Sequence, residues 1–342
     1  MAVTRAEVAK RAGVSPAVVS YVLNPGTRSV SAAARARVEE AIATLGYRPN
    51  LLAQSLRRST SQTLGLLIPE LHGPTVGDFT GAIEDLAYDL GYVLMIATTG
   101  YQPDREDRYL RSFVDRRVDG LIVVGHEPTA LLREIANGGT AVILAGNVMP
   151  GTGISSVSPE GVISSAVAVD HLMSVHGHRR IGCITGPEES QVLSLRSDGW
   201  RLALEKAGLP VDPSLLQRCD IISQRSGFEA TESLLALPEP PTALFFTTEA
   251  QALGGAAAVI RNGMRVGQDV GIVTFGGSVN VSNTLVNFTT VNAHLDDFAK
   301  VVMTRLLEKI SRKNSGESHD STPTDLLIGT SCGCTPERLP GS

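Results

Sequence analysis

The stretch GVSPAVVSYVLN at residues 13–24 decides how this chain is organised. Gly13 permits the left-handed backbone that a sharp turn needs. Ser15 is a favourable N-cap residue, and Pro16 follows at the first helical position, where no backbone N–H is missed. The stretch is therefore predicted to form a tight turn followed by a short helix.

This short helix has two unlike faces, because residues three and four apart share a side. Val19, Val22 and Leu23 form the apolar face. The outer face carries Pro16, Ala17, Ser20 and Tyr21. A short capped helix with small outer residues suits insertion into a DNA major groove. On this pattern alone, an ordinary helical hairpin remains the alternative.

Helix signals also surround this stretch within the first 60 residues. The sequence Thr-Arg-Ala-Glu at residues 4–7 is a capping-box pattern that starts a first helix. Ser31 caps a third helix, and Gly46 closes it. A three-helix unit with so few apolar residues is predicted to have only a small core.

The first 60 residues, which we call the head, differ in charge from the rest of the chain. The 342 residues carry a net charge of −5, with 42% hydrophobic and 19% charged residues. Residues 1–60 hold nine basic and three acidic side chains, whereas the remainder holds 21 basic and 32 acidic ones. A small basic head on an acidic body is typical of a DNA-binding module joined to a part that avoids DNA.

The motifs of the head resemble those of the lactose repressor (LacI/GalR) family of bacterial transcriptional regulators. The resemblance rests on VAKRAGVSPAVVSYVLN at residues 8–24, LGYRPN at 45–50 and the pattern Ala-x-Ser-Leu at 53–56, and it continues to near the C-terminus. It implies an all-α helix-turn-helix head, followed by a two-lobed α/β core similar to periplasmic binding proteins, with parallel sheets flanked by helices.

The resemblance also implies a set of DNA-contacting residues. They are Ser15, Pro16, Ala17, Ser20, Tyr21, Asn24, Tyr47, Asn50, Ala53, Leu56 and Arg57. Pro16, Ala17 and Tyr21 would face the bases. Leu56 would wedge into the minor groove, with plain packing as the alternative. Many family members carry Arg where this chain has Tyr21, so the operator sequence cannot be transferred from them.

Beyond the head, short apolar runs alternate with helical stripes, which favours parallel sheets covered on both faces. The expected strands cover residues 64–69, 93–98, 121–124, 141–145, 181–185, 243–247, 271–275 and 325–328, with a weaker one at 218–222. Residues 295–310 are predicted to form a helix and 311–324 a mobile loop. The expected domains are a head at 1–48, a hinge helix and linker at 49–62, and a core at 63–336, whose lobes comprise 63–158 with 292–321 and 159–291 with 322–336. The chain would cross between the lobes near Ser158, Val291 and Thr322.

In two-lobed proteins of this kind a ligand lies in the cleft, at the carboxyl ends of the strands. The effector-binding residues implied by the resemblance are Glu70, Asn147, Arg196, Ile222, Glu249 and Gly276. Arg196 matches the family's effector-binding arginine, with an interlobe salt bridge as its alternative role. Gly276 and Gly277 replace a frequent Asp-Asp pair. We therefore expect an effector unlike a neutral hexose: an anion, a less polar molecule or no effector at all.

Other chemistry is weakly indicated. Cys183, Cys219, Cys332 and Cys334 show no zinc spacing and are interpreted as unpaired thiols of a reducing compartment. His171, His176 and His178 are interpreted as cationic residues near a helix C-terminus, with metal binding as the alternative. Neither a catalytic set, a metal nor a cofactor is expected, and no apolar run is long enough for a membrane span.

These observations together predict a cytoplasmic, nucleoid-associated regulator that is not an enzyme. It would act as a repressor on double-stranded operator DNA with a palindromic sequence, as a homodimer rather than a tetramer, under control of a small-molecule effector. One alternative is a DNA-binding regulator with a vestigial pocket. Another is a cytosolic solute-binding protein, which would have no use for the basic head.

Overall fold

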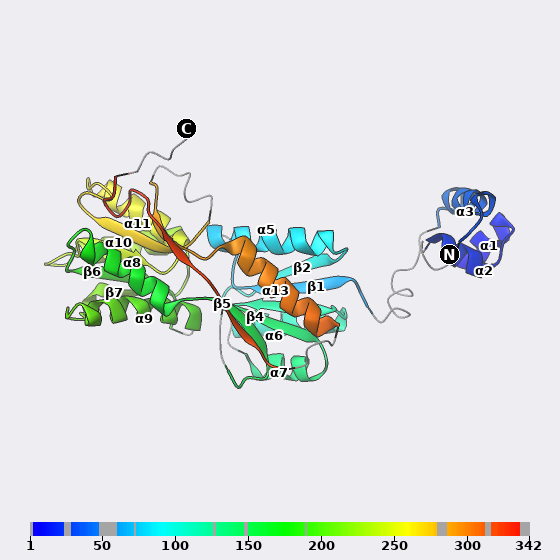
Figure 1. The fold of residues 1–342 in the computed structure, drawn as a ribbon, viewed down its shortest axis with the longest axis horizontal. Helices are drawn as coiled ribbons and strands as arrows, with labels where there is room; N and C mark the ends of the chain where they lie inside the picture. Colours follow the sequence, from blue (N-terminus) through cyan, green and yellow to red (C-terminus); the bar gives the residue numbers. More distant parts are fainter. Residues whose placement is uncertain are drawn as a thin grey trace. The chain divides into compact units, whose positions relative to one another are not determined.

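The computed structural model describes residues 3–23, 29–47, 60–71, 73–125, 128–146, 150–188, 190–278, 286–311 and 316–335. The chain folds as two compact units, Met1–Ser61 and Gln62–Ser342 (Figure 1). The predicted class is confirmed, because a helical head precedes a two-lobed α/β core with parallel sheets.

The described part of the head contains three helices around a small core. They are α1 (Arg5–Ala12), α2 (Pro16–Leu23) and α3 (Ala32–Leu45). The core is built from valine and alanine side chains on all three helices: Val8, Ala9, Ala12, Val19, Val22, Val38 and Ala41. Because these side chains are small, hydrogen bonds and helix caps must contribute much of the order of this unit.

The caps of the head follow the predicted pattern. Thr4 and Glu7 form a reciprocal capping box at α1. Gly13 and Gly46 adopt left-handed φ angles of 62° and 61° and end α1 and α3. Arg37 on α3 donates from Nε to the carbonyl oxygen of Ala12, 3.1 Å away, and so ties α3 to the turn before α2.

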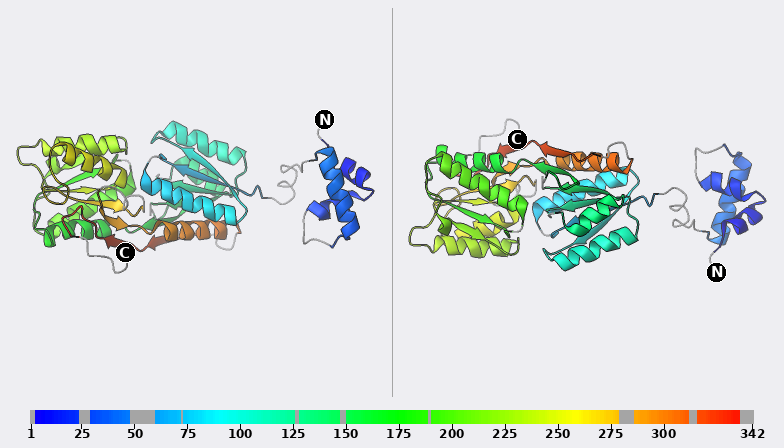
Figure 2. Two further views of the ribbon diagram at one scale, coloured as in Figure 1. Left: turned by 90° about the horizontal axis from the view of Figure 1, so that it is seen from above. Right: turned by 90° about the horizontal axis from the view of Figure 1, so that it is seen from below.

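The first lobe is a parallel sheet with helices on both faces (Figures 1 and 2). Its strand order is β11-β5-β4-β3-β1-β2. The strands are β1 (Thr63–Ile68), β2 (Val93–Thr98), β3 (Gly120–Val124), β4 (Ala141–Ala145), β5 (Ser155–Pro159) and β11 (His319–Thr322). One face is covered by α5 (Pro74–Asp89) and α13 (Leu295–Ile310), and the other by α6 (Pro103–Asp115) and α7 (Ala130–Asn137).

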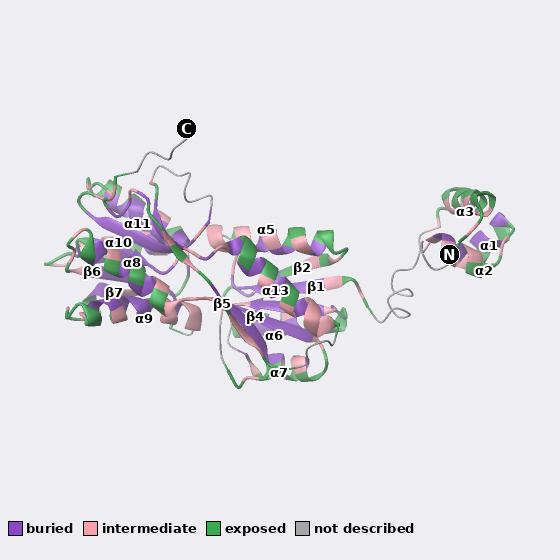
Figure 3. Ribbon diagram, viewed as in Figure 1, coloured by how far each residue is buried: buried purple, intermediate pink, exposed green. Residues whose placement is uncertain are grey.

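The second lobe repeats this design with one antiparallel edge strand, β12, which pairs with β10. Its strand order is β12-β10-β9-β8-β6-β7. The strands are β6 (Ile181–Thr185), β7 (Leu216–Arg218), β8 (Ala243–Phe246), β9 (Gly271–Gly276), β10 (Thr289–Asn292) and β12 (Asp325–Leu327). The covering helices are α8 (Val162–Ser174) and α9 (Gln191–Lys206) on one face, and α10 (Gln224–Leu235) and α11 (Glu249–Arg261) on the other. Figure 3 shows how burial concentrates in the sheets of both lobes.

The two lobes are joined by three crossings of the described chain. They run from β5 to α8, from β10 to α13 and from β11 to β12. The crossing strands pair with each other, because β5 lies beside β11 in the first sheet and β10 beside β12 in the second. A change in the angle between the lobes must therefore be absorbed at these paired strands.

Four secondary-structure expectations need correction, and one of them is β10 at Thr289–Asn292, where no strand was expected. The weak strand expected at 218–222 is instead β7 at Leu216–Arg218, and part of the loop expected at 311–324 forms β11. The sequence SSVSP of β5 had suggested no strand, yet its serines are buried. Their hydroxyls are satisfied, as when Ser156 Oγ lies 2.7 Å from His319 Nδ1 on β11. Paired hydroxyls allow a polar strand to occupy a buried position.

Candidate functional site

The first candidate site is the outer surface of α2 in the head. Val19 and Val22 on α2 are buried, whereas Ser15, Pro16 and Ala17 are exposed. The Ser15 hydroxyl accepts a hydrogen bond from the backbone N–H of Val18 at 3.4 Å and caps the helix. The helix therefore presents its N-terminal turn to the outside, with small, uncharged side chains.

The other predicted DNA contacts fall into two groups. Ser20, Tyr21 and Tyr47 are half-buried, and Tyr47 packs against the core of the head. The predicted contacts that lie outside the described residues are Asn24, Asn50, Ala53, Leu56 and Arg57. The described surface thus brings Ser15, Pro16, Ala17, Ser20 and Tyr21 together on one helix.

The second candidate site is a cavity between the lobes, with a volume of about 140 Å³. Loops after the first-lobe strands form one side, and the N-terminal ends of α9 and α11 form the other. Most of the lining is apolar, including Phe79, Val192, Leu193, Ile222 and Phe298. Its charged lining residues are Glu70, Arg196 and Glu249. Such a cavity favours a small ligand that is mainly apolar.

Arg196 supplies the positive charge of this cavity from α9. Its Nη1 donates to the carbonyl oxygen of Thr247 at 2.7 Å. The guanidinium carbon lies 3.8 Å from the centre of the Phe275 ring, a cation–π arrangement. Burial lowers the pKa of Arg196 to about 10, and the carboxylate of Glu249 opposes this shift. The side chain therefore stays charged at neutral pH, and the Thr247 carbonyl and the Phe275 ring hold it in place.

Glu249 is the first residue of α11 and is fully buried. Its Oε1 accepts hydrogen bonds from the backbone N–H of Gly277 at 2.8 Å and of Ser278 at 3.1 Å, and Oε2 accepts from the Thr75 hydroxyl at 2.8 Å. Burial raises the pKa of Glu249 to about 7, although these hydrogen bonds oppose the shift. Protein groups thus already occupy much of the hydrogen-bonding capacity of Glu249.

Two hydrogen bonds at this point join the lobes. Thr75 and Asp78 belong to α5 in the first lobe, whereas Glu249 and Ser278 belong to the second. Thr75 donates to Glu249, and the Ser278 hydroxyl donates to Asp78 Oδ2 at 2.5 Å. We call these four residues the interlobe latch. Two of its residues, Thr75 and Glu249, also line the cavity beside the N-terminal end of α5.

The remaining predicted effector contacts have different positions. Glu70 lines the cavity and accepts from the backbone N–H of Gly73 at 3.2 Å. Ile222 is buried in the lining. Gly276 packs directly against the side chain of Glu249, because a Cβ atom at position 276 would be 2.3 Å from the Glu249 Cδ atom. Asn147 lies outside the described residues.

Sequence reasoning missed Tyr101, which also lines the cavity. It packs against Leu193, Ile222 and Ala250 of the other lobe, and burial raises the pKa of its hydroxyl. Its φ angle is 59°, a conformation that costs a non-glycine residue energy and that clusters at ligand sites. The signal was its place just after the strand at 93–98, at the edge where ligands bind.

The structure also brings together residues that the sequence analysis treated separately. His171 and His176 lie beside Cys332 and Cys334, with their ligand atoms all within 4.8 Å of one another. The spacing within each half of the sequence had suggested no zinc site. The histidine pair and the cysteine pair are more than 150 residues apart in the sequence, so only the fold shows that the four side chains lie together.

Two family descriptions match the chain. Residues 4–50 match "Bacterial regulatory proteins, lacI family", and residues 61–325 match "Periplasmic binding proteins and sugar binding domain of LacI family". In the described residues, no helix is both long and apolar enough to cross a membrane.

Curated relatives and solved structures agree with these matches. The chain is 30% identical to the HTH-type transcriptional repressor CytR of Escherichia coli K12, over 96% of this chain and 95% of CytR. It is 30% identical to the ribose operon repressor of the same organism, over 90% and 93% of the two chains. The lac repressor dimer bound to operator and the anti-inducer ONPF has a TM-score of 0.84 and 27% identity, covering 97% of this chain and 99% of that one. The CelR–cellobiose complex has a TM-score of 0.71 and 25% identity, covering 96% and 99%.

Proposed function

The chain belongs to the LacI family of bacterial regulatory proteins, and from this premise we propose that it represses transcription as a homodimer on a two-fold-symmetric operator. Members of the family are DNA-binding transcriptional regulators, and this chain is one of them. We place it in the cytoplasm, where its DNA target lies, and we propose that it is a regulator and not an enzyme.

The observation that carries the DNA-binding part is the exposed N-terminal turn of α2. Its small side chains let the helix approach base edges closely, and the head around it is basic. Direct readout would then depend on apolar contact of Pro16 and Ala17 with thymine methyl groups and on the Tyr21 hydroxyl. We retain Leu56 as the minor-groove wedge on the strength of the family resemblance.

The effector part rests on the cavity around Arg196. An apolar cavity of roughly 150 Å³ holds a molecule about the size of benzene. Glu249 is already engaged by Thr75 and two backbone N–H groups. Arg196, which the Thr247 carbonyl and the Phe275 ring hold in place, is the cationic residue of the cavity lining. We propose a small, mainly apolar effector with an anionic group directed at Arg196.

The first experiment selects binding sites for the full chain from a random duplex library. We expect an inverted repeat, bound at least about 1,000-fold more tightly than unrelated DNA. The logarithm of the affinity should fall with the logarithm of salt concentration, with a slope of about −0.9 for each phosphate neutralised. An enriched site without two-fold symmetry, or no enriched site, would overturn the proposal.

A thermal-shift screen then tests the effector. The panel contains neutral sugars, sugar phosphates and acids, nucleobases and small aromatic metabolites. A ligand at about 100 times its Kd adds about 2.7 kcal/mol of stability. A small aromatic or aliphatic acid is the expected hit, and a neutral sugar would contradict the proposed class. A blank panel with operator binding intact would favour a regulator whose pocket is vestigial.

A further inference from the structure

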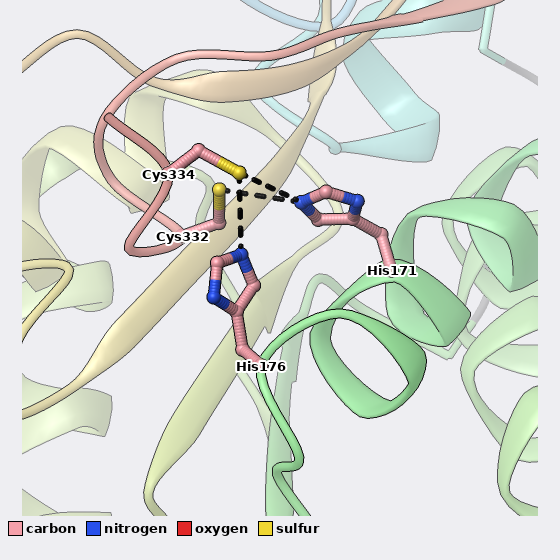
Figure 4. Close-up of side chains that lie close together, drawn as sticks. All are labelled: His171, His176, Cys332 and Cys334. Atoms are coloured by element: carbon pink, nitrogen blue, oxygen red, sulfur yellow. Dashed lines mark hydrogen bonds between the residues drawn. The ribbon is translucent and has the colours of Figure 1, made fainter. Parts of the chain in front are cut away.

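We propose that His171, His176, Cys332 and Cys334 bind one Zn²⁺ ion, which fastens the C-terminal segment of the core to α8. Figure 4 shows the two imidazole rings and the two thiols directed toward a common centre. His171 lies in the last turn of α8 and His176 in the turn that follows it. Cys332 and Cys334 lie after β12, on the segment that ends the described chain.

The distances agree with a tetrahedral zinc site. His171 Nε2 lies 3.4 Å from Cys332 Sγ and 3.6 Å from Cys334 Sγ, and His176 Nε2 lies 3.3 Å from Cys334 Sγ. With Zn–S and Zn–N bonds of about 2.3 and 2.0 Å, tetrahedral geometry places sulfur and nitrogen about 3.5 Å apart. Three of the four sulfur–nitrogen distances therefore already have the required length.

The backbone around the cysteines holds both thiols on one side. Gly333, between them, has a φ angle of 108°. A Cβ atom there would lie 2.7 Å from the Gly267 carbonyl oxygen and 3.2 Å from His176 Nδ1. Only glycine therefore fits this turn. The Thr289 hydroxyl donates to Cys332 Sγ at 3.0 Å, the kind of outer contact that orients a metal ligand.

The chemistry of the set selects zinc. Two thiolates and two neutral imidazoles form a Cys₂His₂ set, which zinc favours in tetrahedral structural sites. The two thiolate charges balance the charge of Zn²⁺, so the filled site buries no net charge. Cys332 is buried and the other three side chains are half-buried, so the four protein ligands enclose the ion. Such a closed site is structural rather than catalytic.

The position of the set says what the ion would stabilise. The first crossing between the lobes leads into α8, and the third leads through β12 to the cysteines. Zinc would therefore tie the C-terminal end of α8 to the segment that follows β12. A link that closes so long a stretch of chain restricts the unfolded ensemble strongly. We expect its main effects on the stability and local opening of the second lobe.

Zinc content of the full chain, purified under reducing conditions without chelator, tests the proposal. We expect about one zinc per chain, and Co²⁺ in its place should give thiolate charge-transfer bands and intense tetrahedral d–d bands. Cys334→Ser and His176→Ala should each weaken zinc binding at least about 100-fold. The matched controls Cys219→Ser and His178→Gln should bind zinc as the wild type does. His178 is a useful control because its Nδ1 pairs with the Thr242 hydroxyl, outside the set.

A second measurement uses only the wild-type chain, so misfolding of a variant cannot affect its result. Removing zinc from the wild-type chain with a chelator should lower Tm by at least about 5 °C, and added zinc should restore it. Hydrogen exchange at residues 171–178 and 329–335 should speed up on zinc removal, while exchange in the head stays unchanged. Full zinc binding by the His176→Ala and Cys334→Ser variants would overturn the proposal. A wild-type chain that contains no zinc under these conditions and takes up none when zinc is added would also overturn it.

Discussion

At the scale of single residues, Glu249 connects the chemistry of the cavity to the closure of the lobes. Its carboxyl group is fully buried, touches the first lobe through Thr75 and holds the chain after β9 through Gly277 and Ser278. Because burial raises its pKa to about 7, this group changes charge near neutral pH. We therefore expect the closure of the lobes to depend on the protonation state of Glu249.

Replacing Glu249 by glutamine should remove this pH dependence. A carboxyl whose pKa is raised on folding keeps its proton while the unfolded chain loses it, so stability falls as pH rises from 4.5 to about 7. The full shift corresponds to at most about 3 kcal/mol. In urea unfolding between pH 4.5 and 8, the wild-type curve should fall through this window and the Glu249→Gln curve should be flatter. Glu205→Gln, an exposed change on α9, is the control, and equal slopes in all three proteins would exclude this role.

Arg196→Ala should abolish most of the effector response while DNA binding persists. A hydrogen bond to a charged group contributes about 1.5–3 kcal/mol, so the effector Kd should rise about 10- to 100-fold. Calorimetry with the effector from the screen measures this change. Arg201→Ala alters an exposed arginine on the same helix and should leave the Kd unchanged. Release of DNA by Arg196→Ala at wild-type effector concentrations would show that Arg196 is not the anchor.

Sequence reasoning reached some of these residues and missed their partners. The resemblance to a known family singled out Arg196 and Glu249, because short motifs surround them. Thr75 is 174 positions from Glu249, and no local pattern in the sequence predicts their hydrogen bond. The sequence analysis missed Tyr101 because its place in the cavity lining depends on a strained backbone conformation, which the residue type does not indicate.

At the scale of elements, local signals predicted the head well. The capping box of α1 and the left-handed glycines after α1 and α3 depend only on neighbours within a few residues, so the sequence contains them. The buried strands β1, β3 and β4 were equally readable, because they are continuous apolar runs. Strand β5 was not, since its serines become buried only when β11 and neighbouring loops supply hydrogen-bond partners.

The role of α2 in DNA binding leads to a test with a matched helix position. Ala17 is the second residue of α2, and Ala33 is the second residue of α3; both are exposed. Aspartate in a first helical turn is favoured by the helix dipole, so neither Ala17→Asp nor Ala33→Asp should unfold the head. Only Ala17→Asp would place a negative charge against DNA. We expect it to weaken operator binding at least about 100-fold in fluorescence anisotropy, and Ala33→Asp by less than about 5-fold. Equal losses would argue against α2 as the recognition helix.

At the scale of the whole core, the lobes are connected covalently by three crossings and non-covalently by the interlobe latch. The crossings fix which edges of the two sheets stay together. The four latch residues form two hydrogen bonds, one donated by Thr75 of α5 to Glu249 and one accepted by Asp78 of α5 from Ser278. A hydrogen bond contributes about 1 kcal/mol net, so the latch can bias the lobes toward closure without locking them. An effector that prefers the closed form would then add to this bias.

Thr75→Val should shift the core toward the open form. Valine keeps the shape of threonine but cannot donate to Glu249, so the binding-competent closed form becomes less populated and the apparent effector Kd rises about 3- to 10-fold. Small-angle scattering of the effector-free chain should show a larger radius of gyration. Thr231→Val removes a buried hydroxyl that donates to Gly227 within one helix, and it should affect stability alone. Unchanged affinity and radius in Thr75→Val would exclude the latch as a determinant of closure.

The close packing of Gly276 against Glu249 also constrains how this binding site can evolve. A lineage that gains a side chain at position 276 while Glu249 is present meets an overlap, because the new Cβ would lie 2.3 Å from the Glu249 Cδ atom. A lineage that first loses Glu249 leaves the backbone N–H groups of Gly277 and Ser278 without their acceptor. Either order passes through a less stable intermediate. An exchange of Glu249 for a carboxylate at position 276 therefore disturbs the packing or the hydrogen bonds of this region, whichever substitution comes first.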